Sequence, residues 1–188
     1  MGRWEPGSRG RLEQAALELF GERGFESTTV AAIAERAGLT ERTFFRHFTD
    51  KREVLFWGAG SLQDLLVAEV DDAPPEQPPL DVVLGALRTA ADGFFADRGD
   101  HARQRQAVID ANAELQEREL IKLARLASAL ADALRRRGVG DPAAGLTAEA
   151  AIAVFRIAFE TWVHATDPGT LADAITAAAT ELRAVTRS

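Results

Sequence analysis

Apolar residues recur with the period of an α-helix along nearly the whole chain, and no sustained alternation of apolar and polar residues indicates a β-strand. The segment 71–80, DDAPPEQPPL, interrupts this pattern because four prolines in ten residues exclude a helix. The pattern predicts an all-α fold of about nine helices, at residues 9–23, 30–37, 40–48, 50–70, 80–95, 101–111 and 113–137, an eighth capped by Thr147, and a ninth capped by Asp167.

Composition sets the broad class of the protein. The 188 residues are 46% hydrophobic and 27% charged, which is typical of one globular domain or of a small head joined to a larger body. Cysteine is absent, which excludes disulfides and thiolate metal sites. No stretch approaches the roughly 18 apolar residues of a membrane span, and the first 25 residues lack a signal-peptide core. The sequence therefore predicts a cytoplasmic protein without a membrane partner.

The segment from Val30 to Lys51, VAAIAERAGLTERTFFRHFTDK, holds two short predicted helices joined through Gly38. Neither helix is long enough to bury its apolar face alone, but both can pack on the first helix of the chain. Glycine enters a tight left-handed turn without steric cost, so the second helix can lie across the first. The spacing predicts a helix-turn-helix unit with a polar, partly cationic outer face.

Net charge gives only weak support for a nucleic-acid partner. The total is −7, but residues 1–52 hold 9 basic and 8 acidic side chains, whereas residues 53–188 hold 13 and 21. A nearly neutral head thus precedes an acidic body, and a DNA-binding hypothesis depends on pattern and spacing.

The N-terminal part of the second helix in such a unit meets base edges, while neighbouring groups contact phosphates. Arg42 can donate twice to guanine, and the Thr43 methyl can touch a thymine methyl. The alternative is that Thr29 and Thr40 are only helix caps and that Arg42 is a solvated charge. The predicted DNA-binding residues are Thr29, Thr40, Arg42, Thr43, Phe45, Arg46, His47 and Lys51.

The run from Ala15 to Leu55 resembles the TetR family of bacterial transcriptional repressors, with its G-F, T-T-V, I-A, A-G and H-F-x-x-K elements in the family's order. The resemblance is specific over about residues 9–56 and only architectural beyond them. In the family a phosphate-contacting tyrosine commonly precedes x-H-F, whereas this chain has Phe45. Without a hydroxyl, Phe45 can pack or touch sugars and apolar base groups.

The resemblance implies a DNA-binding head at residues 1–50 and an effector-binding, dimerising body at residues 51–188. It further implies a homodimer on a palindromic double-stranded operator, released by a small-molecule effector. The aromatic residues of the body favour an apolar or aromatic effector, although for each single residue core packing is the stronger interpretation. The predicted effector residues are Trp57, Phe94, Arg105, Gln106, Ile109, Asp110, Phe155 and Trp162, with Phe95 and Arg156 as further candidates.

Apolar residues of the last two predicted helices are spaced three and four apart, which suits antiparallel packing of helices from two chains. The alternative is that these residues form the protein's own core. The predicted dimer-interface residues are Ile152, Phe159, Leu171, Ile175, Ala178 and Leu182.

The basic run Arg135-Arg136-Arg137 lies in the last turn of a predicted helix. The negative end of the helix dipole stabilises cations there, so the run is interpreted as structural.

The sequence predicts no catalytic site, metal site or cofactor. His47, His101 and His164 are far apart in the chain, and no HExxH, GxGxxG or P-loop motif is present. The alternative to a DNA-binding regulator is a helical small-molecule-binding or protein-interaction module in which the helix-turn-helix only supports packing. A DNA-binding protein loses affinity as salt rises, and such a module does not.

Overall fold

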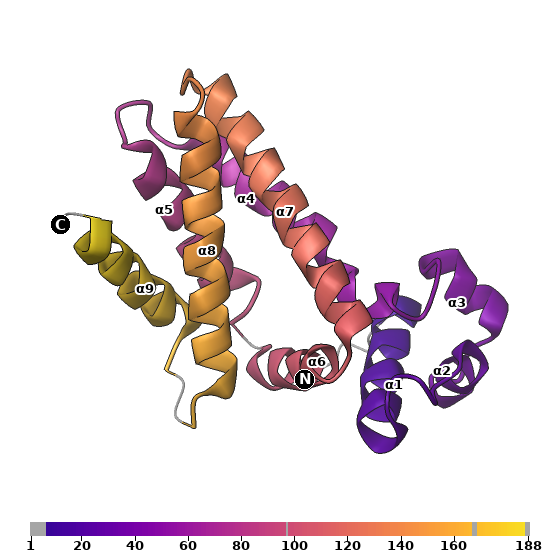
Figure 1. Ribbon diagram of the computed structural model, residues 1–188. Coiled ribbons are helices and arrows are strands. Elements are labelled where there is room, and N and C mark those ends of the chain that lie inside the picture. The colour runs from indigo at the N-terminus through magenta and orange to yellow at the C-terminus, as the bar shows by residue number, and fades with distance from the viewer. Residues whose placement is uncertain (1–6, 97, 167–168, 187–188) are drawn as a thin grey trace, which may run out of the picture. The chain divides into compact units, whose positions relative to one another are not determined.

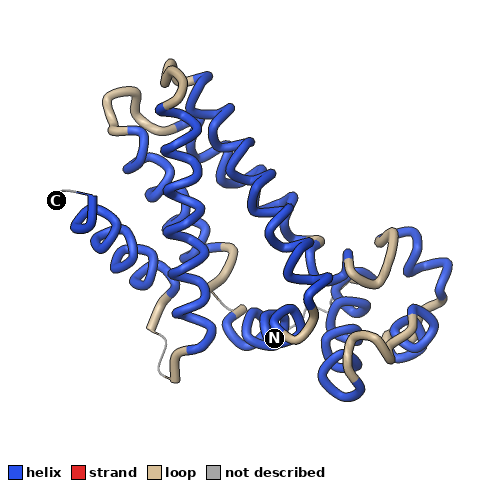
Figure 2. The backbone as a smooth tube through the Cα atoms, viewed as in Figure 1, coloured by secondary structure: helices blue, strands red, loops and turns tan. Residues whose placement is uncertain are grey.

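The computed structural model describes residues 7–96, 98–166 and 169–186. These residues form nine α-helices and one 3-10 helix and contain no strand, so the predicted all-α class is confirmed (Figures 1 and 2). None of these helices is long and apolar enough to cross a membrane. The helices are α1 Ser8–Arg23, α2 Val30–Arg36, α3 Glu41–His47, η1 Glu53–Phe56, α4 Gly58–Asp72, α5 Pro79–Gly93, α6 Gly99–Asp110, α7 Ala113–Arg136, α8 Ala143–His164 and α9 Leu171–Thr186.

The predicted fourth helix differs most from the structure. Asp50 does begin a turn, because its carboxylate accepts from the backbone N–H of Arg52 at 2.8 Å and of Glu53 at 3.1 Å. The chain then forms the 3-10 helix η1, and α4 begins only at Gly58. The residues at 54, 55 and 56 are all at least 95% buried, and one face of a regular α-helix does not bury three consecutive side chains. The tighter winding of η1 allows this burial.

Three further helix ends differ from their predictions. The helix α5 ends at Gly93, two residues before the predicted end at residue 95, and α6 begins at Gly99, two residues before its predicted start at residue 101. The helix α8 begins at Ala143, one turn before the expected cap Thr147. The expected cap of the ninth helix, at residues 167–168, lies outside the described residues. In the structure, Thr170 directly precedes α9, and its hydroxyl accepts from the backbone N–H of Asp173 at 3.0 Å.

The chain divides into two compact units, each with its own core. Unit 1 comprises residues 1–58 and 104–119 and therefore contains α1, α2, α3, η1, the end of α6 and the start of α7. Its core is built on fully buried side chains of α1, α2 and α3, joined by residues of the α6–α7 corner. The largest of these buried side chains are Leu12, Leu19, Ile33, Phe44, Ile109 and Leu115.

Unit 2 comprises residues 59–103 and 120–188, in which α8 packs on α9 and both pack on α5.

The three arginines at the end of α7 have structural partners, as the sequence suggests. Arg135 pairs with Asp132 and Asp141, and Arg136 pairs with Asp71. The Arg137 guanidinium donates to the carbonyls of residues 70, 73 and 74 and so satisfies the carboxyl end of α4.

Candidate nucleic-acid interface

The two helices of the predicted helix-turn-helix are α2 and α3, and a threonine caps each of them. Thr29 Oγ1 accepts from Ala32 N at 3.2 Å, and Thr40 Oγ1 accepts from Thr43 N at 3.2 Å. Gly38 lies between the helices with φ +64°, a left-handed conformation that favours glycine. Both caps are exposed, so their hydroxyls can also meet a ligand from solvent.

The helix α3 has one buried and one exposed face. Phe44 and Phe48 are buried and pack with their ring centres 5.3 Å apart. Arg42 and Arg46 are exposed, and Phe45 is 55% exposed although its ring packs at nearly a right angle to that of Phe44. This arrangement holds α3 by its aromatic residues and presents two cations and an aromatic ring to solvent.

An ion-pair cluster fastens α2 to α1. Arg36 on α2 donates to Glu22 at 2.8 Å through two separate hydrogen bonds and to Glu18 at 3.3 Å. The hydrogen bond from Arg36 lowers the pKa of Glu22 below its usual range. These pairs are exposed, so their contribution to the free energy of unfolding is small, but they orient α2 on α1.

His47, at the end of α3, is hydrogen-bonded to Ser8 at the start of α1, with 2.7 Å between Nε2 and the serine Oγ. Burial, with smaller contributions from Arg46 and Arg9, lowers the pKa of His47 below 6.5. Ser8 was not among the predicted residues, because no local pattern in the sequence links positions 39 residues apart.

We expect His47→Gln to reduce the pH dependence of stability between pH 7 and 5.5. The folded chain binds the proton of His47 less tightly than the unfolded chain does, so stability falls as pH drops below 6.5. Thermal unfolding of both proteins at several pH values measures the effect. Carboxylates are common to both proteins, so their contribution cancels in the difference. If the stability of the variant and of the wild type depends on pH in the same way, His47 does not contribute to that pH dependence.

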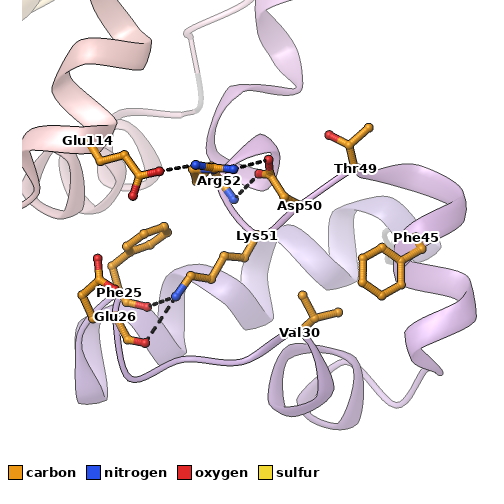
Figure 3. Close-up of a pocket in the computed structure, with 9 residues that line it drawn as sticks. All are labelled: Phe25, Glu26, Val30, Phe45, Thr49, Asp50, Lys51, Arg52 and Glu114. Carbon is orange, nitrogen blue, oxygen red and sulfur yellow. Dashed lines mark hydrogen bonds and ion pairs between the residues drawn. The ribbon is translucent and has the colours of Figure 1, made fainter.

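Lys51 follows α3, and its ammonium contacts the loop between α1 and α2. The Nζ donates to the carbonyls of Phe25 at 2.8 Å, Glu26 at 3.3 Å and Thr28 at 3.1 Å. It also lies 4.3 Å from the centre of the Phe25 ring. Figure 3 shows the side chain directed toward this loop, beside an open pocket of about 360 Å³.

Ion pairs join the segment after α3 to the α6–α7 corner of unit 1. Arg52 contacts Asp50 at 2.9 Å and also pairs with Glu114, as Figure 3 shows, and Arg118 pairs with Glu53. Burial alone would raise the pKa of Asp50, but hydrogen bonds from Arg52 and from the Glu53 backbone lower it. Five charged side chains thus hold η1 against the residues 104–119.

The structure brings all eight predicted DNA-binding residues together in unit 1, six of them on α3 or at its cap. Thr43 and His47 are half-buried, and the ammonium of Lys51 is directed into the unit rather than away from it. Sequence reasoning did not identify the residues that hold this surface in place. These are Ser8, Phe25 and Thr28, whose hydroxyl donates to Gly24 O at 2.8 Å.

The predicted effector residues fall into two groups. In unit 2, Phe94, Phe155 and Trp162 belong to an aromatic cluster with Phe95 and Phe159, in which the centres of neighbouring rings are 5.1–6.5 Å apart. Arg156 lies in the same unit and pairs with Glu160 at 3.3 Å. The remaining five predicted effector residues lie in unit 1: Trp57, Arg105, Gln106, Ile109 and Asp110.

Some polar atoms of the predicted effector residues in unit 1 already have hydrogen-bond partners within the chain. Arg105 donates to Leu55 O at 2.7 Å and pairs with Glu119 at 3.0 Å; burial lowers the pKa of this guanidinium, and Glu119 opposes the effect. Gln106 donates to Asp110 at 2.9 Å. Among the described residues, Trp57 Nε1 and Gln106 Oε1 are buried atoms without a hydrogen-bond partner. Leaving such atoms unpaired is costly. A partner from outside the chain would have to accept from the indole N–H of Trp57 and donate to the amide oxygen of Gln106.

The predicted dimer residues face the core of unit 2. Ile152, Leu171 and Ile175 are at least 94% buried within the single chain, and the other three are half-buried. The exposed apolar residues of α8 are instead Leu146, 68% exposed, and Ile157, 50% exposed. With Ala153 they lie seven and four residues apart, which places them on one face of the helix.

Two family models match the chain. The model described as bacterial regulatory proteins, tetR family, matches residues 13–56, and the model described as the MftR C-terminal domain matches residues 77–187. The HTH-type transcriptional regulator TcmR of Streptomyces glaucescens is 40% identical over 81 residues, which cover 43% of this chain and 36% of TcmR. The HTH-type transcriptional repressor KstR2 of Mycobacterium tuberculosis is 40% identical over 47 residues, which cover 25% of this chain and 24% of KstR2.

Solved structures share the fold along nearly the whole chain. FadR of Thermus thermophilus, a transcriptional repressor solved with lauroyl-CoA, is 22% identical, with 93% of this chain and 92% of FadR covered and a TM-score of 0.52. SmeT of Stenotrophomonas maltophilia, the repressor of a multidrug efflux pump, was solved with triclosan. That complex is 19% identical, with 93% of this chain and 90% of SmeT covered and a TM-score of 0.63.

Proposed function

The chain belongs to the TetR family of bacterial regulatory proteins, and from this premise we propose that it is a ligand-responsive repressor that binds a palindromic operator as a homodimer. The observation that carries the proposal is the geometry of α3. Its buried Phe44 and Phe48 anchor the helix, and Arg42, Phe45 and Arg46 are exposed along it. The proposal places the protein in the cytoplasm, where the chromosome lies.

The exposed side chains of α3 match the two tasks of a recognition helix. Arg42 lies in its first turn, where side chains reach base edges, and can donate two hydrogen bonds to guanine. Thr29 and Thr40 supply hydroxyls, and Arg46 supplies a positive charge, for the phosphates beside the major groove. Phe45 offers an apolar ring to sugars or to thymine methyls.

We infer that the effector is an apolar or aromatic small molecule bound in the body of the chain. The five-ring cluster around Phe95 in unit 2 supports this, because such rings form the walls of apolar ligand sites. The complexes of T. thermophilus FadR with lauroyl-CoA and of SmeT with triclosan are consistent with it. An effector releases the operator only if it binds better to a state in which the two heads no longer fit grooves about 34–36 Å apart.

The proposed dimer uses the exposed face of α8, where Leu146, Ala153 and Ile157 form an apolar stripe. We expect Ile157→Glu to raise the dissociation constant of the dimer at least about tenfold, because each buried isoleucine contributes about 1.5–3 kcal/mol and a two-fold interface loses two of them. Light scattering coupled to size-exclusion chromatography over a concentration series measures this.

A matched control for that variant is Leu120→Glu, which introduces the same charge at a 60% exposed residue of α7. We expect it to remain dimeric with unchanged helical content. If Ile157→Glu keeps the wild-type dissociation constant, the interface lies elsewhere on the chain.

Selection of bound duplexes from a random pool tests the proposed function. The expected result is an enriched inverted repeat whose half-sites are about one helical turn apart. Affinity for that duplex should fall steeply as salt rises, because bound counterions are released. Failure to enrich any sequence at low salt would favour the alternative, a helical module that binds small molecules or proteins.

A further inference from the structure

Three basic side chains gather where the start of α1 meets the end of α3. The Ser8 hydroxyl lies 2.7 Å from Nε2 of His47, so the two helix ends are in direct contact. After burial, which has the largest effect, the charges of Arg46 and Arg9 lower the pKa of His47, because both guanidinium groups lie close enough to repel an added proton. Arg9 of α1 therefore joins Arg46 and His47 of α3 in one basic cluster.

The charge of Arg9 is not neutralised as that of other arginines in unit 1 is. Arg36, Arg52 and Arg105 each pair with a carboxylate. Within the described part of the chain, Arg9 forms no ion pair, and its guanidinium instead lies over the Trp57 ring, with Cζ 5.5 Å from the ring centre. The Arg9 side chain is exposed. A guanidinium stacked on a ring keeps the N–H donors of its edge, so Trp57 orients Arg9 and leaves its donors to solvent.

The position of Arg9 in α1 gives no structural reason for its charge. The helix begins at Ser8, and no acidic residue lies in its first turn. The free N–H groups of that turn form the positive end of the helix dipole, which repels a cation. A side chain that opposes its local environment without a compensating partner is typical of a functional residue. An anion beside Arg9 would offset the repulsion.

We propose that Arg9 binds a phosphate of the DNA backbone, so that the DNA interface extends from α2 and α3 to the start of α1. The proposal rests on the proposed function. The guanidinium can donate two parallel hydrogen bonds to one phosphate. Because α1 contacts the end of α3 and Arg42 lies in its first turn, this phosphate lies beside the one assigned to Arg46 and away from the base that Arg42 reads. Arg9 thus adds affinity that does not depend on sequence.

The test compares Arg9→Met with the wild type over a salt series, on the selected operator and on an unrelated duplex. We expect the slope of log K against log salt to fall by about 0.9 for each head, and affinity at about 0.1 M salt to fall about eightfold for each head. Both duplexes should be affected equally, because a phosphate contact does not read sequence. Arg9→Lys keeps the charge and should restore most of the slope.

Arg23→Met is the matched control for Arg9→Met. It removes the same charge from an exposed arginine at the other end of α1, about 21 Å along the helix. We expect Arg23→Met to keep the wild-type slope. An equal reduction in the two variants would show only long-range attraction to DNA and would overturn the proposal, as would a wild-type slope in Arg9→Met.

Modification of arginines with phenylglyoxal, followed by mass spectrometry, tests the same contact in the wild-type protein, without a variant that has to fold. We expect Arg9 to react in the free protein and to be protected in the operator complex, whereas Arg23 should react equally in both. If the operator binds and leaves Arg9 as reactive as before, this proposal alone is wrong. If the wild type binds no duplex at low salt, the proposed function is wrong as well.

Discussion

Arg42→Ala is expected to bind its operator about 5- to 150-fold less tightly at each half-site, with the loss concentrated at one base pair. A bidentate contact from arginine to guanine contributes about 1–3 kcal/mol of discrimination against other bases. Arg42 lies in the first turn of α3 and is exposed, and the cap at Thr40 fixes the start of that helix. The variant should therefore tolerate any base at one position of each half-site where the wild type requires a guanine.

Competition between the operator and duplexes substituted one base pair at a time measures this change. Arg46→Ala is the matched control, because it removes a second exposed arginine of the same helix, and it should weaken binding to all duplexes by a similar factor. If Arg42→Ala loses equal affinity for the operator and for a scrambled duplex, Arg42 does not read a base.

Phe44→Ala is expected to reduce the free energy of unfolding of unit 1 by about 3–5 kcal/mol, the usual loss for a fully buried phenylalanine. The Phe44 side chain is 0% exposed and packs against Phe48 at the centre of the helix-turn-helix. Such a loss approaches the whole stability of a small unit, so operator binding should disappear with it.

Amide hydrogen exchange followed by mass spectrometry locates this effect. Peptides from α1 to α3 should exchange faster, whereas peptides from α8 and α9, which belong to the other unit, should be unchanged. The neighbouring variant Phe45→Ala is the control: its ring is 55% exposed, so we expect less than about 1.5 kcal/mol of destabilisation, the upper value for one aromatic contact. Equal destabilisation by the two variants would contradict the assignment of the buried face of α3.

The ends of helices were predictable where a single residue determines them. Thr29 and Thr40 cap α2 and α3, and Gly24 follows the end of α1 with φ +82°, because caps and left-handed glycines act through neighbouring atoms. The region of η1 was not predictable in this way. Val54 and Leu55 fit the apolar stripe of a regular helix, and only the burial of Phe56 beside them in unit 1 distinguishes the 3-10 form.

The candidate interface was predictable in its exposed residues and not in its supports. The identity of Arg42 and its place in a short amphipathic helix are local properties of the sequence. The partners of Lys51 and His47 lie 23–39 residues away along the chain, and no periodicity relates them. Similarly, residues 104–119 belong to unit 1, where Ile109 and Leu115 join the core and ion pairs reach Arg52 and Glu53. Patterning along one helix does not reveal these long-range contacts.

Three cations of unit 1 place their charges on carboxylates and carbonyls of the same unit: Arg36, Lys51 and Arg52. Attraction of a protein to DNA of arbitrary sequence grows with the number of cations that neutralise phosphates, and this attraction is what allows sliding along a duplex. With three charges engaged inside unit 1, we expect the proposed DNA-binding protein to hold unrelated duplexes weakly and to search for its operator mainly by release and recapture from solution.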